Sequence, residues 1–238
     1  RGGLQALTPL GFPAAHLDSI TNNSVPLINP GSDSLRIDSM IIAGASWFAL
    51  DSNYKYPVYI ASKDTLNLGI DFKPQANGVC LASVKVYHSG IDSVGTILLH
   101  GATKVFMDSI GVNESTSKDY TVFNFTDTDR YIESVTTKSS SVFPVTGLTK
   151  KTVKSGDSLR GNLTFNANTE KDITGTGSLK WDGNTTSLAF EGFGVAPQIL
   201  LKKLINLYPP KIGINQRDTI YLRNTGTDTL FVSHFTST

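Results

Sequence analysis

The chain has 238 residues, of which 39% are hydrophobic and only 17% are charged, and its formal net charge is +1 at pH 7. No Lys- or Arg-rich stripe is present that could release counterions from phosphates, so the composition argues against a nucleic-acid partner. No run approaches the roughly 18 apolar residues that span a membrane, and we expect no membrane insertion. The length allows one large domain or two ordinary ones.

The single cysteine, Cys80, excludes an internal disulfide. Its neighbours Val79, Leu81 and Ala82 are apolar, so we predict that the thiol is a small buried hydrophobic group. The chain begins at Arg1 and not at Met, which favours a mature product or a fragment from which any signal peptide is already missing.

Short strands separated by turn residues fill the first hundred residues. Apolar runs and alternating patterns predict strands near 7–12, 20–28, 35–42, 66–72, 81–87 and 94–99. Pro9 and Pro13 are compatible with an edge strand at the start. About seven short strands with turns roughly every 8–12 residues are typical of an antiparallel β-sandwich.

The same order of features then returns. Residues 158–165 match 65–72, and a third pass begins near Pro197. Within this pass we assign 199–205 to a strand because the repeat requires one and Pro209 and Pro210 follow at once. We therefore predict an all-β chain of tandem immunoglobulin-like antiparallel β-sandwiches. Module 1 covers 1–101, module 2 covers 102–196, and the first half of a third module covers 197–238.

One turn marks all three passes. Residues 224–228 (Asn-Thr-Gly-Thr-Asp) separate two extended runs, 220–222 and 230–232, and this pattern predicts a β-hairpin. Related turns follow Asn29 and Asn124. The asparagines of the three turns thus lie about one small domain apart.

The repeat resembles the bacterial Ig-like modules of the ASPM/SPD-2/Hydin (ASH) class, which occur in choice-of-anchor D surface proteins. The likeness rests on the Asn-centred turn, the strand end Ile-Asp-Phe-Lys-Pro at 70–74, the closing glycines Gly101 and Gly192, and the junction 192–199. The second module departs from the pattern, because Asn-Ala at 166–167 replaces Lys-Pro and its turn lacks Gly. The resemblance implies non-enzymatic spacers or binding units on secreted or surface proteins.

Asp followed by Ser or Thr and then by an aliphatic residue or Met occurs nine times. The tripeptide resembles the O-glycosylation acceptor sequence of Bacteroidota surface proteins. Asp-Ser also favours turns that lead into strands, so a purely structural role stays open beside glycan attachment. The candidate acceptors are Ser19, Ser34, Ser39, Thr65, Ser93, Ser109, Ser158, Thr219 and Thr229.

The sequence shows no pattern of catalytic chemistry. The four histidines, at 16, 88, 100 and 234, lack the spacing of metal ligands. No Ser has the context of a nucleophile elbow, and the loop carboxylates lack EF-hand spacing. We therefore predict no catalytic residues, no metal site and no cofactor, and a protein that is not an enzyme.

The unfinished third pass is the most informative feature for function. About forty residues of half a sandwich cannot bury a core alone. Either the chain belongs to a longer array, or strands from a neighbouring subunit complete the module. In the second case the candidate strand-exchange interface consists of Leu7, Leu10, Phe12, Ile220, Leu222, Leu230 and Val232.

These patterns predict a non-catalytic extracellular or cell-surface protein with a structural or adhesive role, and a filament subunit if the strands are exchanged. The alternative is an accessory carbohydrate- or protein-binding module of a larger secreted enzyme, in which Tyr54, Tyr56 and Tyr59 could form a binding patch. The expected partners are other copies of the chain, neighbouring modules of a longer chain, and surface glycans.

Overall fold

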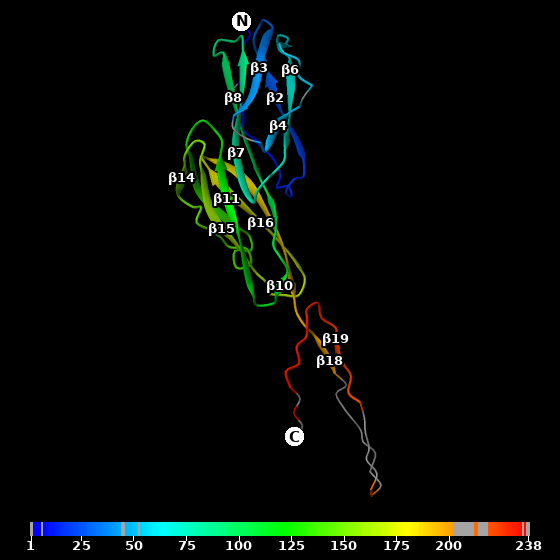
Figure 1. Cartoon of the computed structure of the whole chain (residues 1–238). Coiled ribbons are helices and arrows are strands. Elements are labelled where there is room, and N and C mark those ends of the chain that lie inside the picture. Colours follow the sequence, from blue (N-terminus) through cyan, green and yellow to red (C-terminus); the bar gives the residue numbers. More distant parts are fainter. Residues whose placement is uncertain are drawn as a thin grey trace.

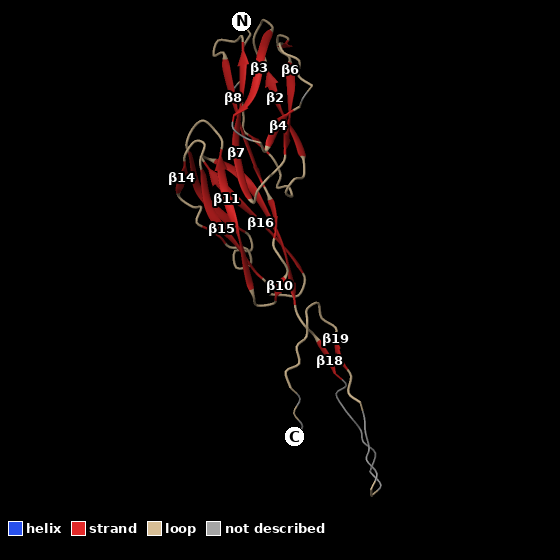
Figure 2. Ribbon diagram, in the orientation of Figure 1, coloured by secondary structure: helices blue, strands red, loops and turns tan. Residues whose placement is uncertain are grey.

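The computed structural model of this chain describes residues 2–5, 7–43, 46–51, 53–201, 212–213, 219–234 and 236. Every regular element within these ranges is a β-strand (Figures 1 and 2), which confirms the predicted all-β fold class. The strands are β1 (Leu10–Gly11), β2 (Thr21–Ile28), β3 (Leu35–Ala43), β4 (Phe48–Leu50), β5 (Val58–Ile60), β6 (Thr65–Phe72), β7 (Gly78–His88), β8 (Val94–Ala102), β9 (Lys104–Phe106), β10 (Ile110–Gly111), β11 (Ser115–Asn124), β12 (Arg130–Thr137), β13 (Val145–Thr146), β14 (Lys151–Val153), β15 (Ser158–Asn166), β16 (Asp172–Trp181), β17 (Asn184–Val195), β18 (Ile199–Leu201) and β19 (Leu222–Asn224).

Apolar alternation located most of these strands correctly. The runs predicted at 20–28, 35–42 and 66–72 correspond to β2, β3 and β6. In the third pass, β18 covers the beginning of the strand predicted at 199–205. The rest of that run, 202–205, lies outside the described residues.

Two hydrophobic cores follow one another along the long axis of the molecule (Figure 1). In the first core, the ring centroid of Phe72 lies 5.4 Å from that of Phe12 and 5.0 Å from that of Phe48. In the second core, the rings of Phe143 and Phe165 stack at 5.1 Å. Aromatic pairs at such distances attract one another beyond what the burial of apolar area contributes.

Glycines near the ends of β8 and β17 leave room for these rings. A Cβ at Gly101 would lie 2.6 Å from the ring of Phe72, and a Cβ at Gly192 would lie 2.7 Å from the ring of Phe165. Any larger residue would have to displace the ring, at a typical cost of about 1–3 kcal/mol. The Gly that recurs in each closing strand is therefore a packing requirement of the core beneath it.

Strand β7 contributes side chains to both cores. Cys80 and Val84 pack in the first core, Val79 and Leu81 pack in the second, and all four are fully buried. Cys80 is thus the small buried group that we predicted, and burial raises the pKa of its thiol. Residues on both sides of the predicted boundary at 101/102 contribute to the second core.

One sheet passes through both cores because β7 has partners on either side. It pairs antiparallel with β8 and β3, and its first residues pair in parallel with β11, from Gly78 opposite Thr121 to Leu81 opposite Asn124. A Cβ at Gly78 would lie 1.8 Å from the carbonyl oxygen of Thr121, so this close approach requires glycine. The longest path through the sheet is β1-β8-β7-β11-β15-β13.

The turns after Asn29 and Asn124 are not the β-hairpins that we predicted. Around Asn29, β2 pairs with β6, whereas β3 pairs with β5 and β7. Around Asn124, β11 pairs with β15 and β7, whereas β12 pairs with β14 and β16. Each turn carries the chain from one sheet to another as a β-arch, so the hairpin prediction was wrong there. After Asn224, β19 pairs with β18, and 230–232 form no strand with any described residue.

Candidate functional site

Asn29 holds the first β-arch together from inside the protein. Its side chain is fully buried. Its Nδ2 donates to the carbonyl of Asp33 across the turn (2.8 Å) and to the carbonyl of Ile60 in β5 (3.0 Å). Its Oδ1 accepts from the N–H of Gly31 (3.1 Å). The amide therefore closes the turn and also joins the turn to a strand about thirty residues further along the chain, as a buried polar group must do to offset its lost hydration.

Asn124 makes the same set of bonds in the second β-arch. It is also fully buried. Its Nδ2 donates to the carbonyls of Thr128 (2.9 Å) and Val153 in β14 (2.9 Å), and its Oδ1 accepts from the N–H of Thr126 (3.1 Å). The absence of Gly from this turn therefore does not change its hydrogen bonding. The regular spacing of the asparagines is visible in the sequence, but their long-range hydrogen-bond partners are not.

The main chain of each buried asparagine makes a second long-range contact. The N–H of Asn29 donates to the carbonyl of Asp64, and the N–H of Asn124 donates to the carbonyl of Asp157, both at 3.0 Å. Each Asp accepts the next N–H on its own Oδ1, at 2.7 Å from Thr65 and from Ser158. Two of the nine Asp-Ser/Thr sequences thus begin β6 and β15 beside an asparagine arch.

Asn224 has the same turn, but it is exposed. Its Nδ2 donates to the carbonyl of Asp228 (2.5 Å), and its Oδ1 accepts from the N–H of Gly226 (3.0 Å). No described residue supplies the strand carbonyl that Ile60 and Val153 supply in the two buried arches. An open groove of about 630 Å³ lies at this place. Its lining consists of Leu222, Asn224, Gly226, Thr227, Asp228, Thr229, Leu230 and Val232.

The turn after Asn224 is fixed to the end of the second sandwich. The N–H of Thr227 donates to the carbonyl of Ala196 (3.0 Å), and its hydroxyl donates to Oε1 of Glu170 (2.7 Å). A Cβ at Gly226 would lie 2.2 Å from the carbonyl oxygen of Ala196, so the contact requires glycine. The groove is therefore formed before anything binds in it.

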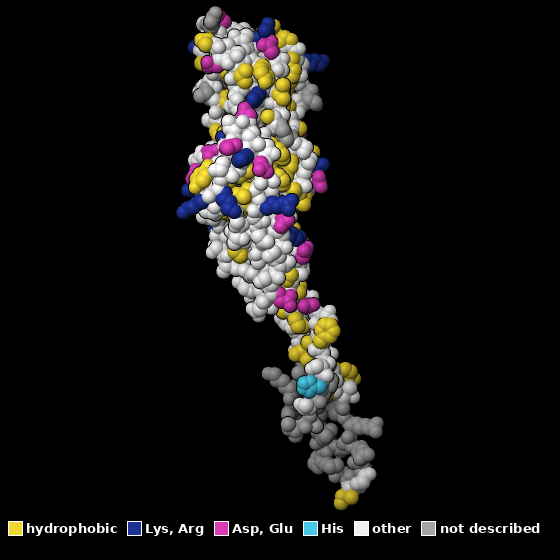
Figure 3. Space-filling view, turned by 60° about the vertical axis from the view of Figure 1, so that its left-hand side comes forward, with side chains coloured by type: hydrophobic (Ala, Val, Ile, Leu, Met, Phe, Trp, Pro, Cys, Tyr) yellow, Lys and Arg dark blue, Asp and Glu magenta, His cyan; other side chains and the backbone are white. Residues whose placement is uncertain are grey.

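Hydrophobic side chains around this turn face solvent. The exposed fractions are 50% for Ile220, 77% for Tyr221, 88% for Phe231 and 45% for Val232. Figure 3 shows hydrophobic side chains on the narrow part of the molecule that follows the second sandwich. Exposed apolar strand residues beside unpaired main-chain groups are typical of surfaces that pair with another chain.

The three N-terminal residues of the predicted strand-exchange interface pack in the first core of their own chain. Leu10 and Phe12 are buried in the first core, and Leu7 is half-buried against it. Residues 10–11 form β1, which pairs in parallel with β8. The structure does not bring these residues together with the C-terminal four, Ile220, Leu222, Leu230 and Val232, which lie beyond the second core.

Eight of the nine candidate glycan acceptors are exposed, and Ser39 is half-buried. Ser39 lies where the pairing of β3 with β7 shifts register. Ser34 and Ser93 directly precede β3 and β8, so the turn-then-strand role of the tripeptide is present at these positions as well as at β6 and β15. Glycan attachment at the exposed hydroxyls stays a prediction.

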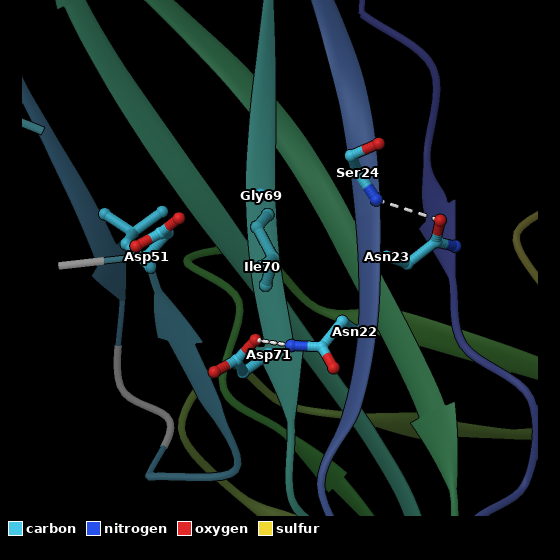
Figure 4. A pocket seen from close by; sticks show the side chains of 8 residues that line it. Asn22, Asn23, Ser24, Asp51, Gly69, Ile70 and Asp71 are labelled. Atoms are coloured by element: carbon cyan, nitrogen blue, oxygen red, sulfur yellow. Dashed lines mark hydrogen bonds between the residues drawn. The ribbon is translucent and has the colours of Figure 1, made fainter. Parts of the chain in front are cut away.

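A shallow polar depression of about 690 Å³ lies on the sheet of β2, β4 and β6 (Figure 4). The Asn22 amide donates to Asp71 Oδ1, and Asp51 lies on the far side of β6. Tyr54 binds β6 through its hydroxyl, which accepts from the N–H of Gly69 (3.0 Å). Two carboxylates in an open depression give no strong ligand set. In the part of the chain that the structure describes, no group of three His, Cys, Asp or Glu side chains could hold a metal ion.

His100 joins the two sandwiches at a buried contact. Its Nδ1 lies 3.0 Å from the hydroxyl oxygen of Thr186, which also accepts from Nε1 of Trp181 (3.0 Å). The rings of His100 and Trp181 meet edge to face at 5.6 Å. Burial lowers the pKa of His100 from 6.5 to about 4, so the imidazole is neutral in the folded protein.

Comparison with known proteins gives similar structures only. No protein-family model matches the chain, and no curated protein matches it. The ASH/PapD-like domain of human CEP192 is 14% identical, with 43% of this chain and 84% of that one covered and a TM-score of 0.33. A protein of unknown function from Porphyromonas gingivalis W83 is 12% identical, with 81% and 96% covered and a TM-score of 0.31. The periplasmic chaperone SfaE is 13% identical, with 81% and 100% covered and a TM-score of 0.35.

None of these similar structures bears on the choice-of-anchor D resemblance, and none supplies a site residue. No helix that could span a membrane occurs in the described ranges.

The first prediction concerns His100. Its pKa is lower in the folded chain than in the unfolded one, so its contribution to stability is complete above pH 6.5 and is lost as the pH falls towards about 4. Between about pH 7.5 and about pH 4.5 this group alone lowers the free energy of unfolding by about 2.5 kcal/mol. Urea unfolding of the wild type and of His100→Gln at both pH values measures it. An equal loss in both proteins would contradict the assignment.

The second prediction compares two asparagines. Asn124→Ala removes the side-chain donor to the buried carbonyl of Val153 and one of the two donors to the carbonyl of Thr128, so we expect it to lower the free energy of unfolding by about 2 kcal/mol. Asn224→Ala affects an exposed turn, and we expect less than about 0.5 kcal/mol. Urea unfolding of both variants gives the comparison. Equal effects would contradict the stabilising role assigned to the buried hydrogen bonds of Asn124.

Proposed function

We propose that this chain is a non-catalytic structural or adhesive protein of the cell surface or extracellular space, built of tandem Ig-like β-sandwiches, and that it assembles through its C-terminal edge. In this proposal residues 197–238 are the first half of a third sandwich, and strands from outside residues 1–238 complete it. The observation that carries the proposal is the open groove beside Asn224, at a turn that is buried under a further strand in both preceding sandwiches.

The energetics of the edge support this assignment. Burial of apolar surface contributes about 25 cal/mol per Å², so covering Phe231, Val232 and Ile220 would stabilise a complex by several kcal/mol before the costs of association. The turn is already fixed by Ala196 and Glu170, which keeps the cost of ordering the edge low. An N-terminal strand as donor is less favourable, because release of Leu10 and Phe12 from the first core would cost about 1.5–3 kcal/mol for each side chain.

The accessory-module alternative has weaker support. Tyr56 and Tyr59 are 40% and 62% exposed, which suits a binding patch, but Tyr54 is turned towards β6 and does not join them. The depression beside Asp51 and Asp71 has no aromatic platform among its lining residues.

The third prediction tests assembly through the edge. In sedimentation velocity experiments on the 25.6 kDa chain we expect species larger than the monomer that grow with protein concentration, because bare edges pair with one another when no other strand covers them. Val232→Asp places a charge on the edge and should shift the distribution to monomer. Ile91→Asp, at an exposed position between β7 and β8, is the matched control. A wild type that is monomeric at every concentration would refute self-assembly.

The fourth prediction concerns the nine acceptor hydroxyls. If they carry glycans, the intact mass of the protein isolated from its own organism exceeds the 25.6 kDa of the bare chain. Replacement of exposed Ser109 by Ala should lower that mass by one glycan. Replacement of half-buried Ser39 by Ala should remove a glycan from a smaller fraction of the molecules. A mass equal to that of the bare chain would remove glycan attachment from the proposal.

A further inference from the structure

We propose that Asn224 recognises the strand that fills this groove, by donating a hydrogen bond from its side-chain amide to a main-chain carbonyl of that strand. The proposal rests on the proposed function, because it presumes that the C-terminal edge accepts a strand from outside residues 1–238. It adds the residue that selects the strand, the register in which the strand binds, and the sequence pattern that the strand carries.

The two buried arches define the register. Ile60, whose carbonyl accepts from Asn29, pairs with Leu35 in β3. Val153, whose carbonyl accepts from Asn124, pairs with Arg130 in β12. Leu35 and Arg130 each stand six positions after their asparagine.

The residue at the same distance after Asn224 is Leu230, which lines the groove. The incoming strand therefore runs antiparallel to the segment that begins at Leu230. The residue opposite Leu230 supplies the carbonyl to Asn224 Nδ2.

The continuation of β5 and β14 defines the pattern. In both sandwiches an Asp stands four residues after the residue whose carbonyl accepts from the asparagine, Asp64 after Ile60 and Asp157 after Val153. The residue before each Asp has a positive φ, which is 65° at Lys63 and 76° at Gly156.

The carbonyl of that Asp accepts the main-chain N–H of the asparagine, and Ser or Thr and then Leu begin the next strand. That next strand pairs along the strand that precedes the asparagine, with Thr65 opposite Ile28 and Ser158 opposite Phe123. The occupant is thus a segment with the pattern apolar-x-x-x-Asp-Ser/Thr-Leu, which bends around Asn224 and binds β19 on one side and the segment from Leu230 on the other.

β18, which pairs with β19, does not cover the side of Asn224 to which such a segment would bind. β18 pairs with β19 so that the N–H of Thr225 donates to the carbonyl of Gln198 (2.8 Å). In the second sandwich the residue after Asn124 uses its N–H in the same way, towards the carbonyl of Leu81 in β7 (2.8 Å). β18 therefore lies on the same side of Asn224 as β7 does of Asn124, although β18 runs antiparallel to its partner and β7 runs parallel. The position that corresponds to β15 is not taken by any described residue.

The source of the segment lies outside residues 1–238, in this copy or in a second one. Both copies of the pattern in this chain, 60–66 and 153–159, are built into finished sandwiches, and their donation would break the bonds to Asn29 and Asn124. A partner repeat that carries the same pattern outside a finished sandwich has no such cost.

The test uses a fluorescent synthetic peptide with the sequence of residues 151–166, added to the full chain at protein concentrations below those that give self-association. We expect saturable binding by fluorescence anisotropy. Asn224→Ala should weaken it about tenfold, the usual effect of a lost hydrogen bond that leaves a carbonyl unpaired. Asn67→Ala, at an exposed position on β6, is the matched control and should bind like the wild type. A peptide of the same composition in scrambled order should not bind.

A second readout follows the amide itself. On binding, the side-chain NH₂ signals of Asn224 in a ¹⁵N spectrum should shift and become protected from exchange with water. Absence of binding, or equal binding by the wild type and Asn224→Ala, would overturn the proposal. If the chain is monomeric in sedimentation but binds the peptide through Asn224, self-assembly fails and the recognition stands. If the chain assembles and Asn224→Ala assembles equally while the peptide does not bind, the recognition fails alone.

Discussion

A buried asparagine amide fixes the corner at which each sandwich passes from one sheet to another. Its N–H and carbonyl groups lose their water on burial, and a missing partner would cost about 1–3 kcal/mol. The geometry that satisfies them closes the turn on one side and binds a distant strand on the other, as in the bonds from Asn124 to Thr128 and Val153. The position of β5 or β14, and of the strand that follows it, depends on this one side chain.

The second constraint is the way in which one unit supports the next. The turn after Asn124 rests on β7 through the N–H of Phe125 and through the ion pair of Asp127 with Lys85 (2.9 Å). Lys85 in turn holds the pKa of the Asp127 carboxyl below its ordinary value. The turn after Asn224 rests in the same manner on the end of the second sandwich, through Thr227 and Glu170. The turn after Asn224 is thus held in place by the unit before it, as the turn after Asn124 is.

Local patterns in the sequence were sufficient to find the strands, the buried Cys80 and the all-β class, because alternation and apolar runs are properties of neighbouring residues. They were insufficient for the asparagine turns. A hairpin and an arch use the same turn formers, and the difference lies in a carbonyl such as that of Val153, far away in the chain. The apolar run from Val79 to Val84 was visible, but alternation predicts one buried face. Both faces of β7 are buried because two cores share it.

In the proposed assembly, an exposed asparagine suits an edge that stands in water until a strand covers it. In water the amide of Asn224 is hydrated, and it adds polarity beside Phe231 and Val232. Once a strand covers it, the same amide requires a main-chain carbonyl from that strand. A strand that offers no carbonyl at this position would bury an unpaired donor. Specificity of this kind depends on the penalty for the wrong partner more than on the gain from the right one. A groove lined only by leucine and valine would accept any apolar strand, whereas a groove with Asn224 at its end accepts a strand in one register.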